Sequence, residues 1–81
     1  MKKKQFRIVT FNRGFITLYE AQVKTWWGWR SFWAASDGRI YYDIEPANTD
    51  ISACRRYIEN YRKSKGLTYD QISISEKNLI K

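Results

Sequence analysis

Histidine is absent from this 81-residue chain, and cysteine and proline occur once each. Without histidine the commonest general acid or base is missing, and no Ser-His or Cys-His nucleophilic pair can form. One cysteine, Cys54, excludes an intrachain disulfide, and a single thiol without histidine does not make a tetrahedral zinc site. We therefore expect no catalysis, no metal and no cofactor. The lone thiol also fits a reducing cytoplasm, where cysteines remain unpaired.

Long apolar runs are lacking as well. The most apolar stretch, Trp26 to Ala35, is interrupted by Arg30 and is far shorter than the ~20 residues that span a membrane. The Met-Lys-Lys-Lys start resembles the positive region of a signal peptide, but Arg7, Asn12 and Arg13 interrupt the apolar segment that should follow. We expect no membrane partner and a location in the cytoplasm of a host cell.

Acidic residues are outnumbered by basic ones, 8 against 15, which leaves a net charge of +7. A charge of this sign favours an acidic or polyanionic partner. The basic residues concentrate in residues 1–13 and 51–65, and the segment between them is mildly acidic. Asp43 and Glu45 are spaced to share a strand face, but the third acid and the lysine of a magnesium-dependent nuclease are missing.

Aromatic residues, in contrast, make up 17% of the chain. Each buries a large apolar area, which partly offsets the small core of a short domain. The four tryptophans all fall between residues 26 and 33, and they cannot all point the same way. Two interpretations remain open: most of them are core, or at least one stays exposed as an interface anchor or a base-stacking platform.

Alternating apolar and polar residues predict an antiparallel meander. The expected strands are residues 5–11, 15–26, 30–36 and 39–44, with turns at 12–14, 26–29 and 36–39. The second strand changes its pattern, because Ile16 and Leu18 share one face whereas Tyr19, Ala21 and Val23 share the other. Either a bulge near Leu18 or the twist of a long strand between two environments would produce this switch.

A helix is predicted over residues 51–65. Its apolar stripe comprises Ile51, Cys54, Ile58 and Tyr61, widened by Tyr57. Asn48 or Thr49 is expected to cap its start, and Gly66 its end. Beyond Gly66, the spacing of Thr68, Ile72 and Ile74 is that of a last short strand.

The fold class that follows is α+β in one domain, residues 1–81. We expect an antiparallel meander of three to four strands with one helix packed on one face, with or without a short C-terminal edge strand. Residues 1–4 are expected to be a flexible basic arm and residues 77–81 a frayed tail. One helix covers only one face of a sheet, so the other face is expected to be polar or a binding surface. The chain is expected to be a monomer or a homodimer.

Ten residues are predicted to bind a partner, because tryptophan and arginine are favoured at protein hot spots and arginine also suits phosphate. They are Trp26, Trp27, Trp29, Arg30, Trp33, Arg39, Arg55, Arg56, Arg62 and Lys63. On the helix, Arg55, Arg62 and Lys63 share a flank. A solvated helix face, with Glu59 paired to Arg55 or Lys63, is the alternative interpretation.

Three strands followed by a helix resemble the plant ethylene-response DNA-binding domains and the arm-binding domains of phage integrases. In those domains arginine and tryptophan on the sheet read the major groove, and here Trp27, Trp29, Arg30, Trp33 and Arg39 would carry that role. The Arg-Gly-Val run of the plant domains is absent from this chain.

Short, basic, aromatic-rich chains with a lysine-rich start also resemble accessory proteins of phages and mobile elements, including the anti-CRISPR inhibitors. The resemblance implies a non-enzymatic protein that docks on, and inhibits or modulates, a host nucleic-acid-processing protein or ribonucleoprotein. The alternative is a domain that binds RNA or DNA directly through the sheet aromatics and the basic flanks. The inhibitor interpretation is preferred because the sequence shows neither a groove-reading element nor an RNA-binding aromatic motif.

Overall fold

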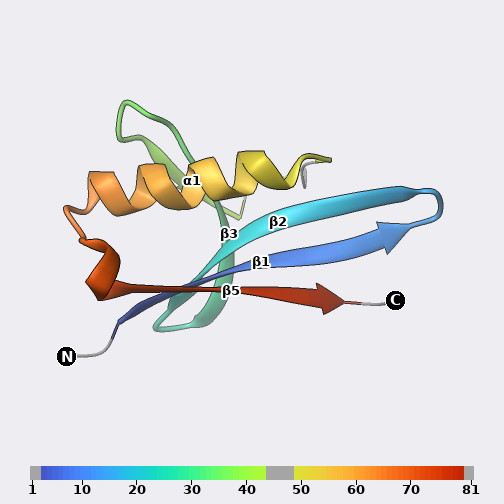
Figure 1. Ribbon diagram of the computed structural model, residues 1–81, viewed down its shortest axis with the longest axis horizontal. Coiled ribbons are helices and arrows are strands. Elements are labelled where there is room, and N and C mark those ends of the chain that lie inside the picture. Colours follow the sequence, from blue (N-terminus) through green and yellow to red (C-terminus); the bar gives the residue numbers. More distant parts are fainter. Residues whose placement is uncertain (1–2, 44–48, 80–81) are drawn as a thin grey trace.

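The fold is α+β, as the sequence predicts, with one helix packed on a five-stranded mixed sheet (Figure 1). A computed structural model describes residues 3–43 and 49–79. The elements in chain order are β1 (Lys4–Arg13), β2 (Ile16–Thr25), β3 (Gly28–Ala34), β4 (Ile40–Tyr42), α1 (Ile51–Ser64), the 3₁₀ turn η1 (Tyr69–Gln71) and β5 (Ile72–Leu79). Glu45 and Asn48 lie outside the described residues.

Strands β1 to β4 form the predicted antiparallel meander, and the C-terminal strand lies at the sheet edge in the order β4-β3-β2-β1-β5. β5 pairs with β1 in parallel, from Lys4 beside Ile72 to Phe11 beside Leu79. A parallel pair needs a long crossover, and the segment containing α1 supplies it. This pairing carries β5 through residues 77–79, for which the sequence predicted a frayed tail. It likewise draws Lys4, expected in the flexible arm, into the sheet.

The first two hairpins close in tighter turns than the sequence predicts. β1 continues to Arg13, which pairs with Ile16, so the first turn is Gly14 and Phe15. The second turn consists of Trp26 and Trp27 alone, because Thr25 pairs with Gly28. Gly28 has a φ of 108°, a conformation that a residue without a Cβ adopts readily. Long paired strands therefore occupy positions that were expected to be loop.

Of the two interpretations of the second strand, the bulge does not form. β1 and β2 pair without interruption from Phe6 beside Val23 to Arg13 beside Ile16. The change in pattern comes instead from a long strand that passes between two environments, which was the other interpretation. Near α1 the apolar residues of β2 face the helix, and beyond it Leu18 lies on the opposite face.

The main core lies between α1 and the sheet face that it covers. Its buried members are Phe6, Ile8, Ala21, Val23, Phe32, Ala34, Cys54, Ile58, Tyr61 and Ile72. The helical stripe predicted from the sequence therefore packs against the strands, with Tyr57 at its margin. The β1–β2 hairpin reaches well past the end of α1, so part of the sheet has no helix over it (Figure 1).

Both ends of α1 carry identifiable caps. Asp50, and not Thr49, is the N-cap, because its side chain accepts a hydrogen bond of 2.9 Å from the backbone N–H of Ser52. At the other end Gly66 has a φ of 66°, and its N–H donates to the Lys63 carbonyl. Thr68, expected within the last strand, instead caps η1, and β5 begins only at Ile72.

Candidate partner-binding surface

The sheet face turned away from α1 carries a polar and basic cluster near the N-terminal end of β1. Side chains alternate along a strand, so the positions next to buried Phe6 and Val23 point to this uncovered face. They are Gln5 and Arg7 in β1, Gln22 and Lys24 in β2, and, across the next pair of strands, Trp29 and Ser31 in β3. Three strands thus contribute to one surface.

Trp29 organises the basic side chains of this face. The Arg7 guanidinium carbon lies 4.3 Å from the centroid of the indole ring, and the Lys24 Nζ lies 5.6 Å from it. Cations are attracted to the negative face of an indole ring, so Trp29 holds Arg7 and Lys24 near each other. Arg7 Nε also donates to Gln22 Oε1 at 2.7 Å, and Gln22 Nε2 donates to Glu20 Oε2 at 2.9 Å.

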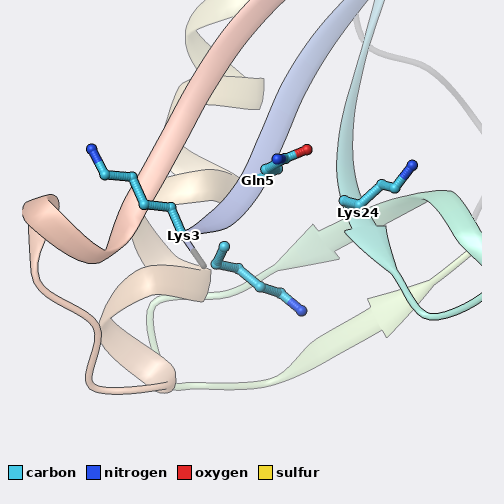
Figure 2. A pocket seen from close by; sticks show the side chains of 4 residues that line it. Lys3, Gln5 and Lys24 are labelled. Atoms are coloured by element: carbon cyan, nitrogen blue, oxygen red, sulfur yellow. The ribbon is translucent and has the colours of Figure 1, made fainter. Parts of the chain in front are cut away.

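A shallow depression of 230 Å³ lies at this end of the sheet, lined by Lys3, Lys4, Gln5 and Lys24. Figure 2 shows Lys3 and Gln5, from the start of the chain, and Lys24, from the end of β2, around it. We call Lys3, Lys4 and Lys24 the lysine cluster. Within the described ranges, none of the three forms an ion pair. Their positive charges therefore remain available to an external anion.

Trp26 and Trp27, which we call the tryptophan turn, follow Lys24 directly in the β2–β3 hairpin. Their side chains are 92% and 84% exposed. The Thr25 hydroxyl fixes the turn, since it donates to the Gly28 carbonyl at 2.8 Å and accepts from the Trp27 N–H at 3.2 Å. Two large indoles are thus presented to solvent on a short, hydrogen-bonded loop beside a basic surface.

The other predicted residues of β3 and the β3–β4 hairpin are engaged within the protein. Trp33 packs against Tyr41 and Tyr57, with ring centroids 5.6 and 6.2 Å apart. Arg30 forms an ion pair of 2.6 Å with Asp43, and this hydrogen bond raises the pKa of the arginine. Arg39 likewise pairs with Asp37 at 2.8 Å.

The basic helix face is divided between engaged and unengaged side chains. Arg55 pairs with Glu76 at 3.1 Å. Arg62, the more deeply buried, bonds to Glu59 and to the Leu67 carbonyl and lies 4.2 Å over the Tyr69 ring. The Arg62 hydrogen bond also lowers the pKa of Glu59.

Arg56 and Lys63 are exposed and make no ion pair with the residues that the structure describes. Both belong to α1, which covers the sheet face opposite Trp29. The ten predicted residues therefore do not form one site. The sequence prediction did not include Gln5, Arg7, Lys24 or the arm lysines among the binding residues. The sequence could have indicated them, because basic and polar residues alternate along two strands that pair across a hairpin.

The groups that the sequence suggested for chemistry are buried, ion-paired or outside the described residues. Cys54 is fully buried, and burial raises the pKa of its thiol to about 11. Asp43 is held by Arg30, while Glu45 falls outside the described residues. Across residues 3–43 and 49–79, no three histidine, cysteine, aspartate or glutamate side chains gather as metal ligands would.

Comparison with protein-family models, with curated proteins and with solved structures gives no match. In the described part of the chain, no helix has the length and apolar character needed to cross a membrane.

Proposed function

We propose that this chain is a non-enzymatic binding protein that docks on a nucleic-acid-handling protein complex of a host cell and inhibits or modulates it. The tryptophan turn is its anchor in this proposal. The observation that carries the proposal is the exposure of two adjacent indoles, 92% and 84%, on one short turn. Such docking in the cytoplasm is how the anti-CRISPR inhibitors act, which the chain resembles in size, charge and aromatic content.

The turn has the properties of a protein hot spot. Tryptophan is enriched among the residues that contribute most to binding, especially where it fills a pocket on the partner. Because Thr25 already fixes the loop by two hydrogen bonds, little conformational freedom is lost when the indoles are buried. The neighbouring lysine cluster favours a partner with an acidic surface and speeds the encounter.

The arrangement of the sheet aromatics supports a protein partner for this turn. RNA-binding sheets stack bases on exposed aromatic rings. Here Arg7 lies over the Trp29 ring, and Trp33 packs against Tyr41 and Tyr57, so both rings are engaged by neighbouring side chains. The large exposed indoles lie at the tip of a hairpin, where they can enter a pocket.

The test compares two hairpin tips of the same protein. Affinity-tagged wild type, Trp26→Ala/Trp27→Ala and Phe15→Ala/Ile16→Ala are incubated with nuclease-treated host lysate, and retained proteins are identified by mass spectrometry. Phe15 and Ile16 form the matched control, because they are exposed apolar residues of the other long hairpin. Wild type and the control are expected to retain one nucleic-acid-handling protein.

The tryptophan variant is expected to bind that protein at least ~30-fold more weakly, since each hot-spot residue contributes about 2 kcal/mol or more. Added to the purified partner, wild type should change its activity and the tryptophan variant should not. Retention that disappears on nuclease treatment, or that both variants lose equally, would contradict the proposal.

A further inference from the structure

The positive charge of this protein is unevenly neutralised. Four arginines, Arg30, Arg39, Arg55 and Arg62, are each paired with a carboxylate in the described part of the chain. Among the same described residues, no carboxylate pairs with the lysine cluster, although its three members line one depression. Uncompensated charge therefore collects at the end of the sheet where β1 begins and β2 ends, with Lys24 and Arg7 on the uncovered face.

Neutral hydrogen-bonding groups lie in the same surface. The parallel register places Ser73 of β5 beside Gln5 and Ser75 beside Arg7. Since paired residues in neighbouring strands share a face, β5 extends the basic surface with two hydroxyls. Glu20 also lies on this face, and its carboxylate accepts a hydrogen bond from Gln22 Nε2. Gln22 is in turn two positions from Lys24. The surface thus runs across β5, β1 and β2 as a band of ammonium, guanidinium, amide and hydroxyl groups.

We infer that this band binds the phosphodiester backbone of a nucleic acid. Lysine, arginine, glutamine and serine are the side chains that donate most hydrogen bonds to phosphate oxygens in complexes with nucleic acid. Lysine binds phosphate as a point charge, and the Arg7 guanidinium adds directional donors.

The lining of the depression argues against an acidic protein as the occupant. Protein interfaces bury an apolar core inside a polar rim. The residues that line the depression are three lysines and Gln5, so its apolar surface comes from their aliphatic stems and it has no large apolar side chain to form such a core. The tryptophan turn supplies the apolar anchor for a protein, and the band supplies the positive charges and hydrogen-bond donors that phosphate groups bind. The two surfaces are adjacent but consist of different residues, and the band does not depend on the proposed docking.

The test measures fluorescence anisotropy of labelled single-stranded RNA, single-stranded DNA and duplex DNA over a range of salt. The site variant is Lys3→Gln/Lys4→Gln/Lys24→Gln. The matched control is Arg13→Gln/Arg56→Gln/Lys63→Gln, which removes the same charge from exposed positions elsewhere. Circular dichroism confirms that both variants are folded.

We expect the site variant to bind at least tenfold more weakly near physiological salt, and the control less than threefold. The slope of log affinity against log salt should fall by about 2 for a single strand, since each lost phosphate contact contributes ~0.7. If the affinity for any of the three nucleic acids depends on the lysine cluster, the inference is supported, and that nucleic acid is the form that is bound.

Equal losses in the two variants would show that only net charge matters, and would overturn the inference. Competition by polyglutamate as effective as that by RNA would also overturn it, because the band would then recognise carboxylates. The result is separable from the proposed docking. Trp26→Ala/Trp27→Ala should keep its affinity for nucleic acid, and the site variant should keep the protein partner in nuclease-treated lysate.

Discussion

At the scale of single residues, the core depends on aromatic rings that meet edge to face around Tyr61. Its ring centroid lies 5.3 Å from that of Phe6 and 5.1 Å from that of Phe32. Pairs of this kind contribute about 0.5–1.5 kcal/mol beyond the area they bury. The Tyr61 hydroxyl, which would be costly to bury alone, shares a hydrogen bond of 3.0 Å with that of Tyr42. Burial raises the pKa of Tyr61, so its phenol stays neutral.

Cys54 gives a test of burial at this scale. Burial raises the pKa of its thiol to about 11, whereas an exposed cysteine has a pKa of about 8.5. Between these values the unfolded chain loses the thiol proton and the folded chain keeps it. The free energy of unfolding should therefore fall as pH rises through this window, by at most about 1.4 kcal/mol per pH unit from this group.

The measurement is urea denaturation of wild type and Cys54→Ala from neutral pH to about pH 10. Tyrosines and lysines titrate in both proteins, so the informative quantity is the difference between the two slopes. Wild type should lose stability more steeply than Cys54→Ala. Parallel slopes would mean that the thiol is accessible in the folded protein.

At the scale of elements, the start of α1 is defined by one side chain. Asp50 accepts from the Ser52 N–H at 2.9 Å, and the first turn contains no other acid. Asp50→Ala should reduce the free energy of unfolding by about 1 kcal/mol, because it removes this cap and a favourable charge at the positive end of the helix.

Thr49→Ala is the control, since Thr49 is the neighbouring residue that the sequence also allowed as a cap. It should change the free energy of unfolding by less than about 0.5 kcal/mol, as exposed substitutions usually do. Urea denaturation at neutral pH distinguishes the two variants. If Thr49→Ala destabilised the protein more than Asp50→Ala, Thr49 and not Asp50 would be the N-cap.

At the scale of the whole molecule, the main core and the two proposed binding surfaces lie in different parts of the fold. The principal extents are 39 × 26 × 21 Å, because the β1–β2 hairpin and β5 project beyond α1 (Figure 1). Val9 is fully buried although it points away from the helix, in the middle of the sheet between Glu20 of β2 and Lys77 of β5. The exposed indoles and lysines lie outside the main core, where they can be changed without loss of the fold.

Ile58 tests whether that core holds the whole molecule together. It is 2% exposed at the centre of the helical stripe. Ile58→Asp places an unpaired charge there, which costs several kcal/mol, and a domain of this size has only about 5–15 kcal/mol to lose. The variant should be largely unfolded by circular dichroism. Ser52→Asp, which makes the same charge change at an exposed position of α1, should melt like wild type.

Local patterns in the sequence were enough to determine the fold class and the faces of its main elements. The spacing from Ile51 to Tyr61 identified the helical stripe, because a helix repeats every 3.6 residues whatever it packs against. Alternation likewise placed Trp29 and Phe32 on opposite faces of a strand. The lack of histidine excluded histidine-based acid–base and nucleophilic catalysis.

Only the tertiary structure decided which side chains remain free to bind. Arg55 forms an ion pair with Glu76, which is 21 residues away in the sequence, because β5 pairs with β1. No local sequence pattern predicts that contact. Lys24 comes to lie with Lys3 and Lys4 through the register of the β1–β2 hairpin. Trp26 and Trp33 are chemically alike, yet one is at a turn and the other packs against Tyr41. Exposure and ion pairing depend on contacts between distant segments, and folding creates those contacts.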